Sequence, residues 1–249
     1  MNVQPLSIRP VAPRAPGLTL LIHLYYPGSW AILQDKCAYV LRESSRIVIT
    51  ACHDDVILET GYSEKTTILK VTNQGKDVGG KLAALSYYLR FCTRTEFIAL
   101  IHDKISPQTI NAGYWLEKLY GIFEEHCFAR AMRAFKKDPK TGVIGSKAFL
   151  KNEYVRSTRQ FACTNDKILR QMILDHRLTC KAHNFIAGTI FIVRSRIFET
   201  FFTSYSPLEA RGRLEPGNVL DLEQGTFTHS WERLFCFIAE DQGYSVKGI

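Results

Sequence analysis

The stretch FIALIHDKIS occupies Phe97–Ser106. Its five apolar residues, Phe97–Ile101, predict a fully buried strand. The polarity changes at His102, Asp103 and Lys104, which follow the strand directly. In open α/β sheets, ligands bind just beyond the carboxyl ends of the strands. These side chains would therefore suit a charged small molecule, and the alternative is an ordinary junction between a strand and a loop.

The segments before this stretch alternate between two periodicities. Short apolar runs bounded by polar residues predict strands, and spacings of three and four predict helices. Together they predict an α/β fold with a mostly parallel central sheet flanked by helices. The expected strands are Leu18–Leu24, Arg46–Ala51 and Thr66–Val71; the expected helices are Trp30–Arg42 and the segment from the turn at Asn73–Leu82 through Phe91.

The second half of the chain is less regular. A glycine within an apolar run suggests a bulge or the close approach of a ligand, as at Gly188 and Thr189. We expect one domain over residues 18–249, after a flexible proline-rich leader at residues 1–17. The expected elements are a long amphipathic helix at Asn111–Phe135, a strand at Gly142–Leu150, a strand at Phe185–Val193 that is broken by Gly188 and Thr189, a loop at 204–224, a helix at Gly225–Ala239 and a tail at Tyr244–Ile249.

The chain is basic, with a net charge of +8. Such a surface suits a phosphate-bearing substrate, nucleic acid or an anionic membrane. No basic run resembles a nucleic-acid tail, so nucleic acid is not an expected partner, whereas a weak peripheral membrane contact is allowed. The seven cysteines are widely spaced, and no CxxC occurs. This argues against a disulfide framework and a zinc site, and it predicts a reducing cytoplasm.

The sequence NQGKDVGG, Asn73–Gly80, joins an expected strand to an expected helix. Glycines let a backbone approach a ligand, and the start of a helix favours anions. The stretch matches neither a Walker loop nor GxGxxG, so a simple capped turn is the alternative. Another expected strand ends in His53, Asp54 and Asp55. These residues would bind a metal or a ribose, and the alternative is that they cap a helix.

The stretch DLEQGTFTHSWERLF, residues 221–235, is rich in ionisable side chains. Asp221 and Glu223 precede the expected helix, whose dipole favours ionised carboxylates. His229 and Glu232 share a face, whereas we do not expect Glu232 and Arg233 to pair along the helix. A carboxylate beside a cleft is what a general base requires. The alternative is a capped surface helix with ordinary charges.

Taken together, these segments resemble the rhamnan synthesis protein F family of bacterial polysaccharide glycosyltransferases. The chain departs from the family at four positions. Gly28 stands where an acidic residue is usual, Lys76 replaces arginine, Gly80 replaces proline, and Gln224 replaces the aspartate before Gly-Thr. The matching pieces are HLYYPGSW at His23–Trp30, NQGKDVGG at Asn73–Gly80, IHDKIS at Ile101–Ser106, FIAGTIFIVR at Phe185–Arg194 and GTFTHSWERLF at Gly225–Phe235.

The resemblance implies a Rossmann-like GT-A domain that transfers a sugar, often rhamnose, with inversion expected. The favoured donor is dTDP-rhamnose, and the acceptor is a growing glycan or a lipid-linked glycan. The expected location is the cytoplasm, with peripheral contact at the inner membrane face allowed. A non-catalytic module that binds nucleotide sugars or glycans is the alternative, and turnover with labelled donors distinguishes the two.

The implied roles fall into three groups. The general base would be Glu223 or Asp221. Where GT-A enzymes often carry Asp-x-Asp, this chain has a single acid, Asp103. His102 and Lys104, which can be cationic, would neutralise the diphosphate instead. We therefore predict that no divalent ion is required; in the alternative, Asp103 and His229 hold Mg²⁺ or Mn²⁺. The donor side would comprise His23, Asn73, Gly75, Lys76, Asp77, His102 and Lys104; the acceptor or sugar side would comprise Gly188, Thr189, His229, Glu232 and Arg233.

Overall fold

The computed structural model describes residues 15–54, 61–104, 112–221 and 224–249, with side chains from Leu116 onward in the third range. Most of the predicted leader, residues 1–14, lies outside these ranges. The first strand nevertheless begins at Ala15, three residues earlier than predicted, so Ala15–Gly17 belong to the sheet rather than to a leader.

The described chain forms a central sheet of seven strands in the order β11-β5-β10-β4-β1-β2-β3. All neighbours are parallel except at β10, which runs antiparallel to both β4 and β5. The predicted mostly parallel α/β fold is therefore confirmed. The strands are β1 (Ala15–Leu24), β2 (Arg46–Ala51), β3 (Thr66–Lys70), β4 (Thr95–His102), β5 (Thr141–Gly145), β10 (Phe191–Arg194) and β11 (Ser245–Gly248).

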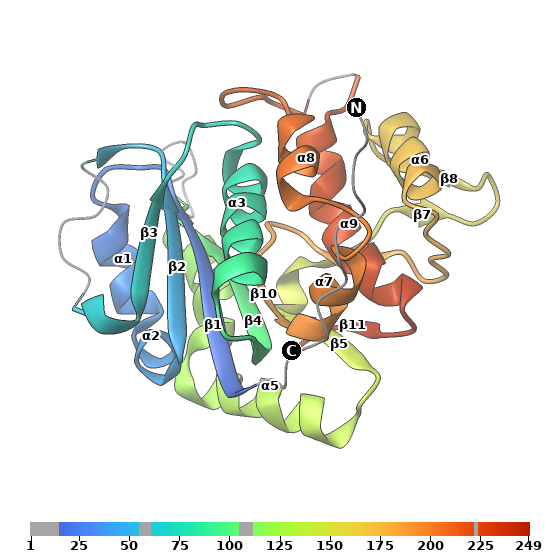
Figure 1. The fold of residues 1–249 in the computed structure, drawn as a ribbon. Helices are drawn as coiled ribbons and strands as arrows, with labels where there is room; N and C mark the ends of the chain where they lie inside the picture. The colour runs from blue at the N-terminus through green and yellow to red at the C-terminus, as the bar shows by residue number, and fades with distance from the viewer. Residues whose placement is uncertain (1–14, 55–60, 105–111, 222–223) are drawn as a thin grey trace.

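Helices cover both faces of this sheet (Figure 1). One face carries α3 (Lys76–Phe91), α7 (Ser195–Phe201), α8 (Pro207–Gly212) and α9 (Phe227–Asp241). The other carries α1 (Ser29–Lys36), α2 (Ala38–Glu43) and α5 (Glu125–Lys137). The remaining helices are α4 (Ala112–Tyr120) and α6 (Asp166–Asp175). Of the helices described, none has the length and apolar character needed to span a bilayer.

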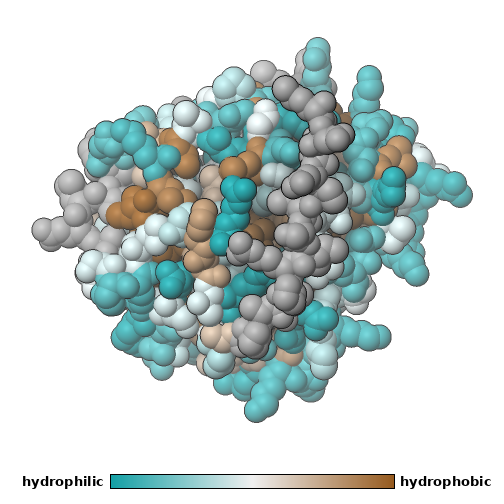
Figure 2. Space-filling view, viewed as in Figure 1, coloured by the Kyte–Doolittle hydropathy of each residue, from teal (hydrophilic) through white to brown (hydrophobic). Residues whose placement is uncertain are grey.

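Apolar side chains from both layers and the sheet form one continuous core. The middle of β1 and of β4 is fully buried, as expected for strands covered on both faces. The surface is mainly hydrophilic, and brown apolar patches are small in the view of Figure 2. One exposed apolar residue, Ile68, lies on the edge strand β3. The continuous core therefore holds the sheet in place, and the sheet can support a site at the ends of its strands.

Three predicted elements are divided in the structure. The helix predicted at Trp30–Arg42 breaks at Cys37, between α1 and α2. The amphipathic segment at Asn111–Phe135 becomes α4, a 3₁₀ turn at Gly121–Phe123 and α5. The strand predicted at Gly142–Leu150 ends at Gly145, before a 3₁₀ turn at Lys147–Phe149 and a short strand, β6 (Leu150–Asn152).

The strand predicted at Phe185–Val193 does break at Gly188 and Thr189, as predicted, but its two parts belong to different sheets. Its first part is β9 (Asn184–Ile186), which pairs with β6, and its second part is β10 of the central sheet. Gly188 and Thr189 turn the chain between them with φ of 80° and 51°. A positive φ at threonine is rare, so the surrounding contacts must hold this turn in place.

Two further predictions are corrected near the end of the chain. The tail predicted at Tyr244–Ile249 contains β11, an edge strand that pairs with β5. The loop predicted at 204–224 contains α8, which has Ser206 as its N-cap and Pro207 in its first turn, both favourable there. Helices α6 and α7, and the ribbon of β7 (Tyr154–Val155) and β8 (Gln160–Phe161), were not predicted.

The strand order places a switch point between β1 and β4. The chain adds β2 and β3 on one side of β1 and then adds β4 on the other side. In open α/β sheets, the crevice at such a point is where ligands bind. His23 at the end of β1 is paired in register with His102 at the end of β4. The two histidines therefore emerge side by side at the carboxyl edge.

Candidate functional site

A cavity of about 590 Å³ opens at this switch point. Volumes of 300–1,000 Å³ are typical of small-molecule sites. Its wall contains residues from both strand ends, from the start of α3, from the turn before β10 and from α9. Eleven of the predicted residues line it: His23, Asn73, Lys76, Asp77, His102, Asp103, Lys104, Gly188, Thr189, His229 and Glu232.

Behind the cavity wall, against three lining residues, lies a lysine that the sequence interpretation missed. The Lys81 side chain is 1% exposed, and its ammonium donates to Asp77 Oδ2 at 3.0 Å. It also donates to the Thr189 carbonyl at 2.9 Å and to Thr189 Oγ1, and it lies 2.8 Å from His102 Nδ1. Lys81 thereby joins α3, the end of β4 and the strained turn before β10.

The Lys81 position carries a sequence signal, although a weak one. Lys81 follows Asp77 by four residues and precedes Leu85 by four, so it lies on the helical stripe that faces the core. A lysine on that stripe needs an ionised partner, because an isolated buried charge is very costly. Burial lowers the pKa of Lys81, and Asp77 opposes that shift.

Asp77 was predicted to contact a ligand, and it does line the cavity. Its Oδ2 also accepts a hydrogen bond from Thr189 Oγ1 at 2.6 Å, in addition to the bond from Lys81. Burial alone would raise the pKa of Asp77, but the facing Lys81 ammonium and the Thr189 hydroxyl hold it well below the ordinary range. Asp77 is thus an ionised carboxylate whose first task is to neutralise Lys81.

The His102 side chain is 7% exposed. Burial and then the charge of Lys81 lower its pKa well below the ordinary value, and Asp77 acts in the opposite direction. His102 is therefore neutral at pH 7. The prediction that it meets a diphosphate as a cation is corrected, because its ring sits against a buried ammonium. Tyr120 supports this strand end by donating to the His102 carbonyl at 2.7 Å.

His23 forms another part of the cavity floor. Its Nδ1 lies 3.0 Å from Thr50 Oγ1, and its Nε2 lies 4.0 Å from the sulfur of Cys52. Burial lowers the pKa of His23 to about 4. A Cβ at Gly80 would overlap the imidazole, so this glycine provides the space for His23.

Asp103 is the single acid after β4. Its Oδ2 accepts from the Tyr25 and Tyr26 amides at 2.8 and 2.7 Å and from Ser29 Oγ at 2.6 Å. Burial raises its pKa, against the effect of these donors. Asp103 thus anchors the loop from β1 to α1, where the sequence interpretation missed Tyr25 and Tyr26 as cavity residues.

These contacts do not fit the alternative Mg²⁺ or Mn²⁺ site at Asp103 and His229. Asp103 Oδ2 already accepts from three donors, and Lys104, the next residue, brings positive charge to the cavity wall. Lys81 brings a second positive charge behind Asp77 and His102. Among the described residues, no three His, Cys, Asp or Glu side chains are grouped as metal ligands. His229, the other proposed ligand, is engaged on α9.

The start of α3 is covered by the segment after α8. The Gly75 amide donates to the Glu215 carbonyl at 2.8 Å, and Gly217 donates to the Asn73 carbonyl at 2.7 Å. Asn73 Nδ2 donates to Asn218 Oδ1 at 3.1 Å, and Lys76 donates to the Val219 carbonyl at 3.2 Å. Asn73 and Lys76 thus stand at the cavity wall as predicted, together with Asn218, which was missed.

Gly75 does not line the cavity, contrary to its predicted contact with the donor. It has a φ of 74° at the N-cap of α3 and packs against Leu214, where a Cβ would overlap the leucine side chain. Its role is to make the turn that aims Asn73 and Lys76 at the cavity.

His229 faces the cavity from the first turn of α9. Its amide donates to Thr226 Oγ1, the N-cap, at 3.0 Å, and its Nδ1 lies 2.6 Å from the same oxygen. Asp221 Oδ1 is 4.0 Å from Nδ1. Burial lowers the pKa of His229, although Asp221 acts in the opposite direction. A neutral imidazole beside a carboxylate has the elements of a general base.

Glu232 lines the cavity, whereas Arg233 does not. Glu232 accepts from the Gly188 amide at 2.5 Å, which ties α9 to the turn before β10. Arg233 donates to Glu232 Oε2 at 2.8 Å, so the prediction that these neighbours do not pair is wrong. Arg233 also forms a two-pronged pair with Glu153 and lies over Phe185, so it braces α9 rather than meeting a ligand.

Asp221 lies behind His229 rather than in the cavity wall. Asn165 Nδ2 donates to both of its oxygens, at 2.9 and 2.8 Å, and Asn165 Oδ1 accepts from the Thr226 amide. Asp221 is therefore placed to orient α9. Glu223 lies outside the described residues, as do Asp55 and Ser106.

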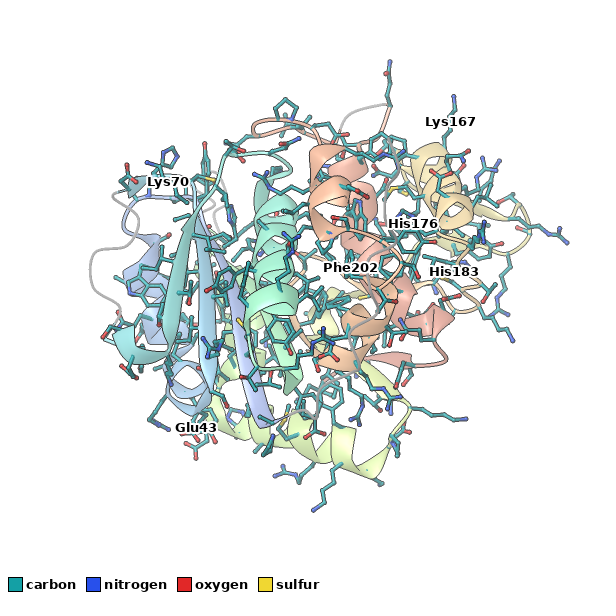
Figure 3. All side chains as sticks on the ribbon, viewed as in Figure 1. Glu43, Lys70, Lys167, His176, His183 and Phe202 are labelled. Carbon is teal, nitrogen blue, oxygen red and sulfur yellow. The ribbon has the colours of Figure 1, made fainter. Side chains whose placement is uncertain are left out.

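The other histidines with ring contacts in this half of the molecule serve packing. His176 lies near Tyr205 and Trp231, and His183 stacks on Tyr154 with ring centres 4.0 Å apart. Figure 3 shows both on the side of the molecule that carries α6. Neither lines the cavity.

Comparison with known proteins adds no assignment: no protein-family model matches the chain, and no curated protein matches its sequence.

Proposed function

We propose that this chain is a glycosyltransferase of the GT-A type that moves a sugar from a nucleotide donor to a glycan or lipid-linked acceptor. The donor that the sequence resemblance favours is dTDP-rhamnose. The observation that carries the proposal is the composition of the cavity at the switch point. Lys76 and Lys104 offer positive charge for a diphosphate, while Asp77, Glu232 and the Gly188–Thr189 turn offer oxygens for sugar hydroxyls.

In this proposal the donor lies across the ends of β1 and β4. Its nucleoside would lie near Tyr25, Tyr26 and Asn73, whose rings and amide suit a base and a ribose. Its diphosphate would lie between Lys76 and Lys104. The sugar would then point toward Gly188 and Glu232, on the acceptor side.

His229 is the group best placed to accept the proton, with Asp221 behind it. The nearby carboxylate favours a proton on Nδ1, which leaves the Nε2 lone pair for the acceptor hydroxyl. The acceptor oxygen would bond to the anomeric carbon as the bond from that carbon to the phosphate oxygen breaks. The nucleoside diphosphate leaves with the electron pair, and inversion follows from one displacement. Glu223 stays an alternative base.

A reducing, cytoplasmic location fits the cysteines. All seven lie within the described ranges, and each is a free thiol. Burial raises the pKa of Cys236 to about 12, which suppresses its reactivity. Peripheral contact with an anionic membrane remains part of the proposal, because the net charge of +8 would favour it.

A non-catalytic nucleotide-sugar module is the second candidate. It is favoured by one observation: the described acids of the cavity wall are already engaged, Asp77 by Lys81, Asp103 by the loop after β1 and Glu232 by Arg233. Such a module would bind donors without turnover.

A ligand panel followed by a turnover assay tests the proposal. At about 100 times its Kd, a nucleotide sugar should raise the unfolding free energy by about 2.7 kcal/mol, which a thermal-shift assay detects. The stabilising donor is then incubated with acceptor glycans. His229→Gln should keep donor binding and lower turnover by about 10²–10⁴-fold, as loss of a general base does. Stabilisation without turnover would favour the binding module, and no stabilisation by any nucleotide sugar would refute both.

A further inference from the structure

The imidazole of His102 separates a buried ammonium from the cavity. Its Nδ1 is 2.8 Å from Lys81 Nζ, and its side chain is 7% exposed and lines the cavity. The side-chain contacts of His102 with the described residues are made through Nδ1, which leaves Nε2 as the nitrogen for the cavity. A buried polar side chain that faces a cavity with one nitrogen unengaged is arranged to meet a ligand.

The direction of the bond between Lys81 and His102 follows from the other partners of Lys81. Asp77 is a carboxylate, and the Thr189 carbonyl is an acceptor only. Thr189 Oγ1 gives its own proton to Asp77, so it too must accept from Lys81. The ammonium has three protons for these three oxygens and His102 Nδ1, so two of the four acceptors share one N–H, and it has no lone pair to offer. The contact at 2.8 Å is then favourable only if His102 Nδ1 carries no proton and accepts.

We propose that Lys81 locks His102 in the neutral form with its proton on Nε2, and that this N–H is the donor the cavity presents to an anionic phosphate oxygen. The tautomer follows from the contacts of Lys81 alone. The choice of a diphosphate oxygen rests on the proposed function. His102 would then be a catalytic residue that stabilises the leaving group, and Lys81 would be the positioning residue behind it.

The groups that face His102 from each packed element favour this form. Lys81 on α3, Lys104 after β4 and His23 on β1 all disfavour a second proton, whereas Asp77 on α3 favours one. Donation from the ammonium to Nδ1 also polarises the ring, which strengthens the Nε2 donor. A donor fixed before the reaction needs no reorganisation when charge develops.

Nitrogen-15 NMR of the histidine-labelled wild-type protein tests the tautomer directly. We expect His102, assigned from the spectrum of His102→Gln, to show a proton on Nε2 and a lone pair on Nδ1 at pH 7. Inorganic pyrophosphate and dTDP should then shift the Nε2–H resonance. A proton on Nδ1, or on both nitrogens, would overturn the proposal. The expected tautomer without any ligand-induced shift would overturn its ligand half.

Activity measurements test the catalytic consequence. His102→Phe removes the donor and should lower turnover by about 10²–10³-fold, which is the usual effect of losing one such donor. His102→Gln supplies a neutral N–H and should recover part of that loss. Equal loss in both variants would contradict the role of a neutral donor. Because the tautomer is read on the wild type, its test stands even if no sugar transfer is found.

Discussion

At the scale of single residues, burial keeps His23 uncharged at pH values at which an exposed histidine is protonated. His23 is 1% exposed, and its ring fills the space above Gly80. Water cannot solvate an imidazolium there, so burial lowers the pKa of His23 to about 4. In the unfolded chain the same group titrates near its ordinary value of about 6.5. Folding and protonation of His23 therefore compete.

The competition predicts a pH dependence of stability. Between about pH 6.5 and pH 4, the unfolded chain binds a proton at His23 that the folded chain does not. The unfolding free energy should therefore fall as the pH falls through this window, by up to about 3 kcal/mol from this group. Urea denaturation of wild type and His23→Gln at about pH 7 and about pH 4.5 measures the difference.

The comparison must be between variants, since other groups titrate as well. Lowered pKa values at His102 and His229 act in the same direction, and raised values at Asp103 and Glu240 act in the opposite one. His126→Gln is the matched control, because that side chain is 78% exposed. The loss of stability between the two pH values should shrink only in His23→Gln. Parallel curves for all three proteins would contradict the assignment.

At the scale of elements, α3 supplies three of the charged side chains in and behind the cavity wall. Its first turn supplies Lys76 and Asp77, its second supplies Lys81, and its glycines let it approach β1 closely. A glycine inside a helix ordinarily costs roughly 0.5–1 kcal/mol relative to alanine. Here the absence of a side chain at Gly80 is what admits the His23 ring, so the ordinary preference should be reversed.

We therefore expect Gly80→Ala to destabilise the fold by about 1–3 kcal/mol, as overpacking does. At Gly212, which ends α8, an added Cβ would meet no atom within 4 Å and the backbone φ is unstrained, so Gly212→Ala should be neutral or stabilising. Chemical denaturation measures both. Adding His23→Ala to Gly80→Ala should restore part of the loss, and a Gly80→Ala protein as stable as wild type would refute the close-packing argument.

The elements also show where sequence patterns stop being informative. Buried runs such as Leu18–Leu24 predict their strands well, because a strand covered on both faces must be apolar throughout. The run at Phe185–Val193 looks similar, but it divides between two sheets because Lys81 and Glu232 hold the turn at Gly188 and Thr189. Those partners are 108 and 44 residues away in the sequence, and local periodicity carries no trace of them.

At the scale of the whole molecule, the sheet order determines which predicted residues meet. Residues that end β1 and β4 could be placed together from the sequence, because parallel strands end at one edge. The α9 residues could be proposed but not placed, because their position depends on Asn165 at the start of α6, a helix that was not predicted. Lys81 was missed because a lysine on a helix is ordinarily solvated.

The arrangement of the whole molecule also determines which charged groups lie at the cavity. In the proposed reaction, a departing nucleoside diphosphate needs its developing charge stabilised, by a divalent ion or by fixed donors. Asp103 is the lone acid after β4, and its Oδ2 is engaged by the loop before α1. Lys76, Lys81 and Lys104 meanwhile supply positive charge from two elements. Nearby positive charge disfavours binding of a further cation.

We therefore expect transfer to persist after EDTA treatment and Lys104→Ala to be far more damaging than chelation, by about 10²-fold or more in turnover. Lys137→Ala is the matched control: it removes the same charge from the end of α5, at the opposite edge of the sheet, and should leave turnover unchanged. Rates are compared with EDTA, and again with Mn²⁺ restored. Turnover that disappears in EDTA and returns with Mn²⁺ would show that an ion, held by Asp103 with the donor phosphates, carries the charge instead.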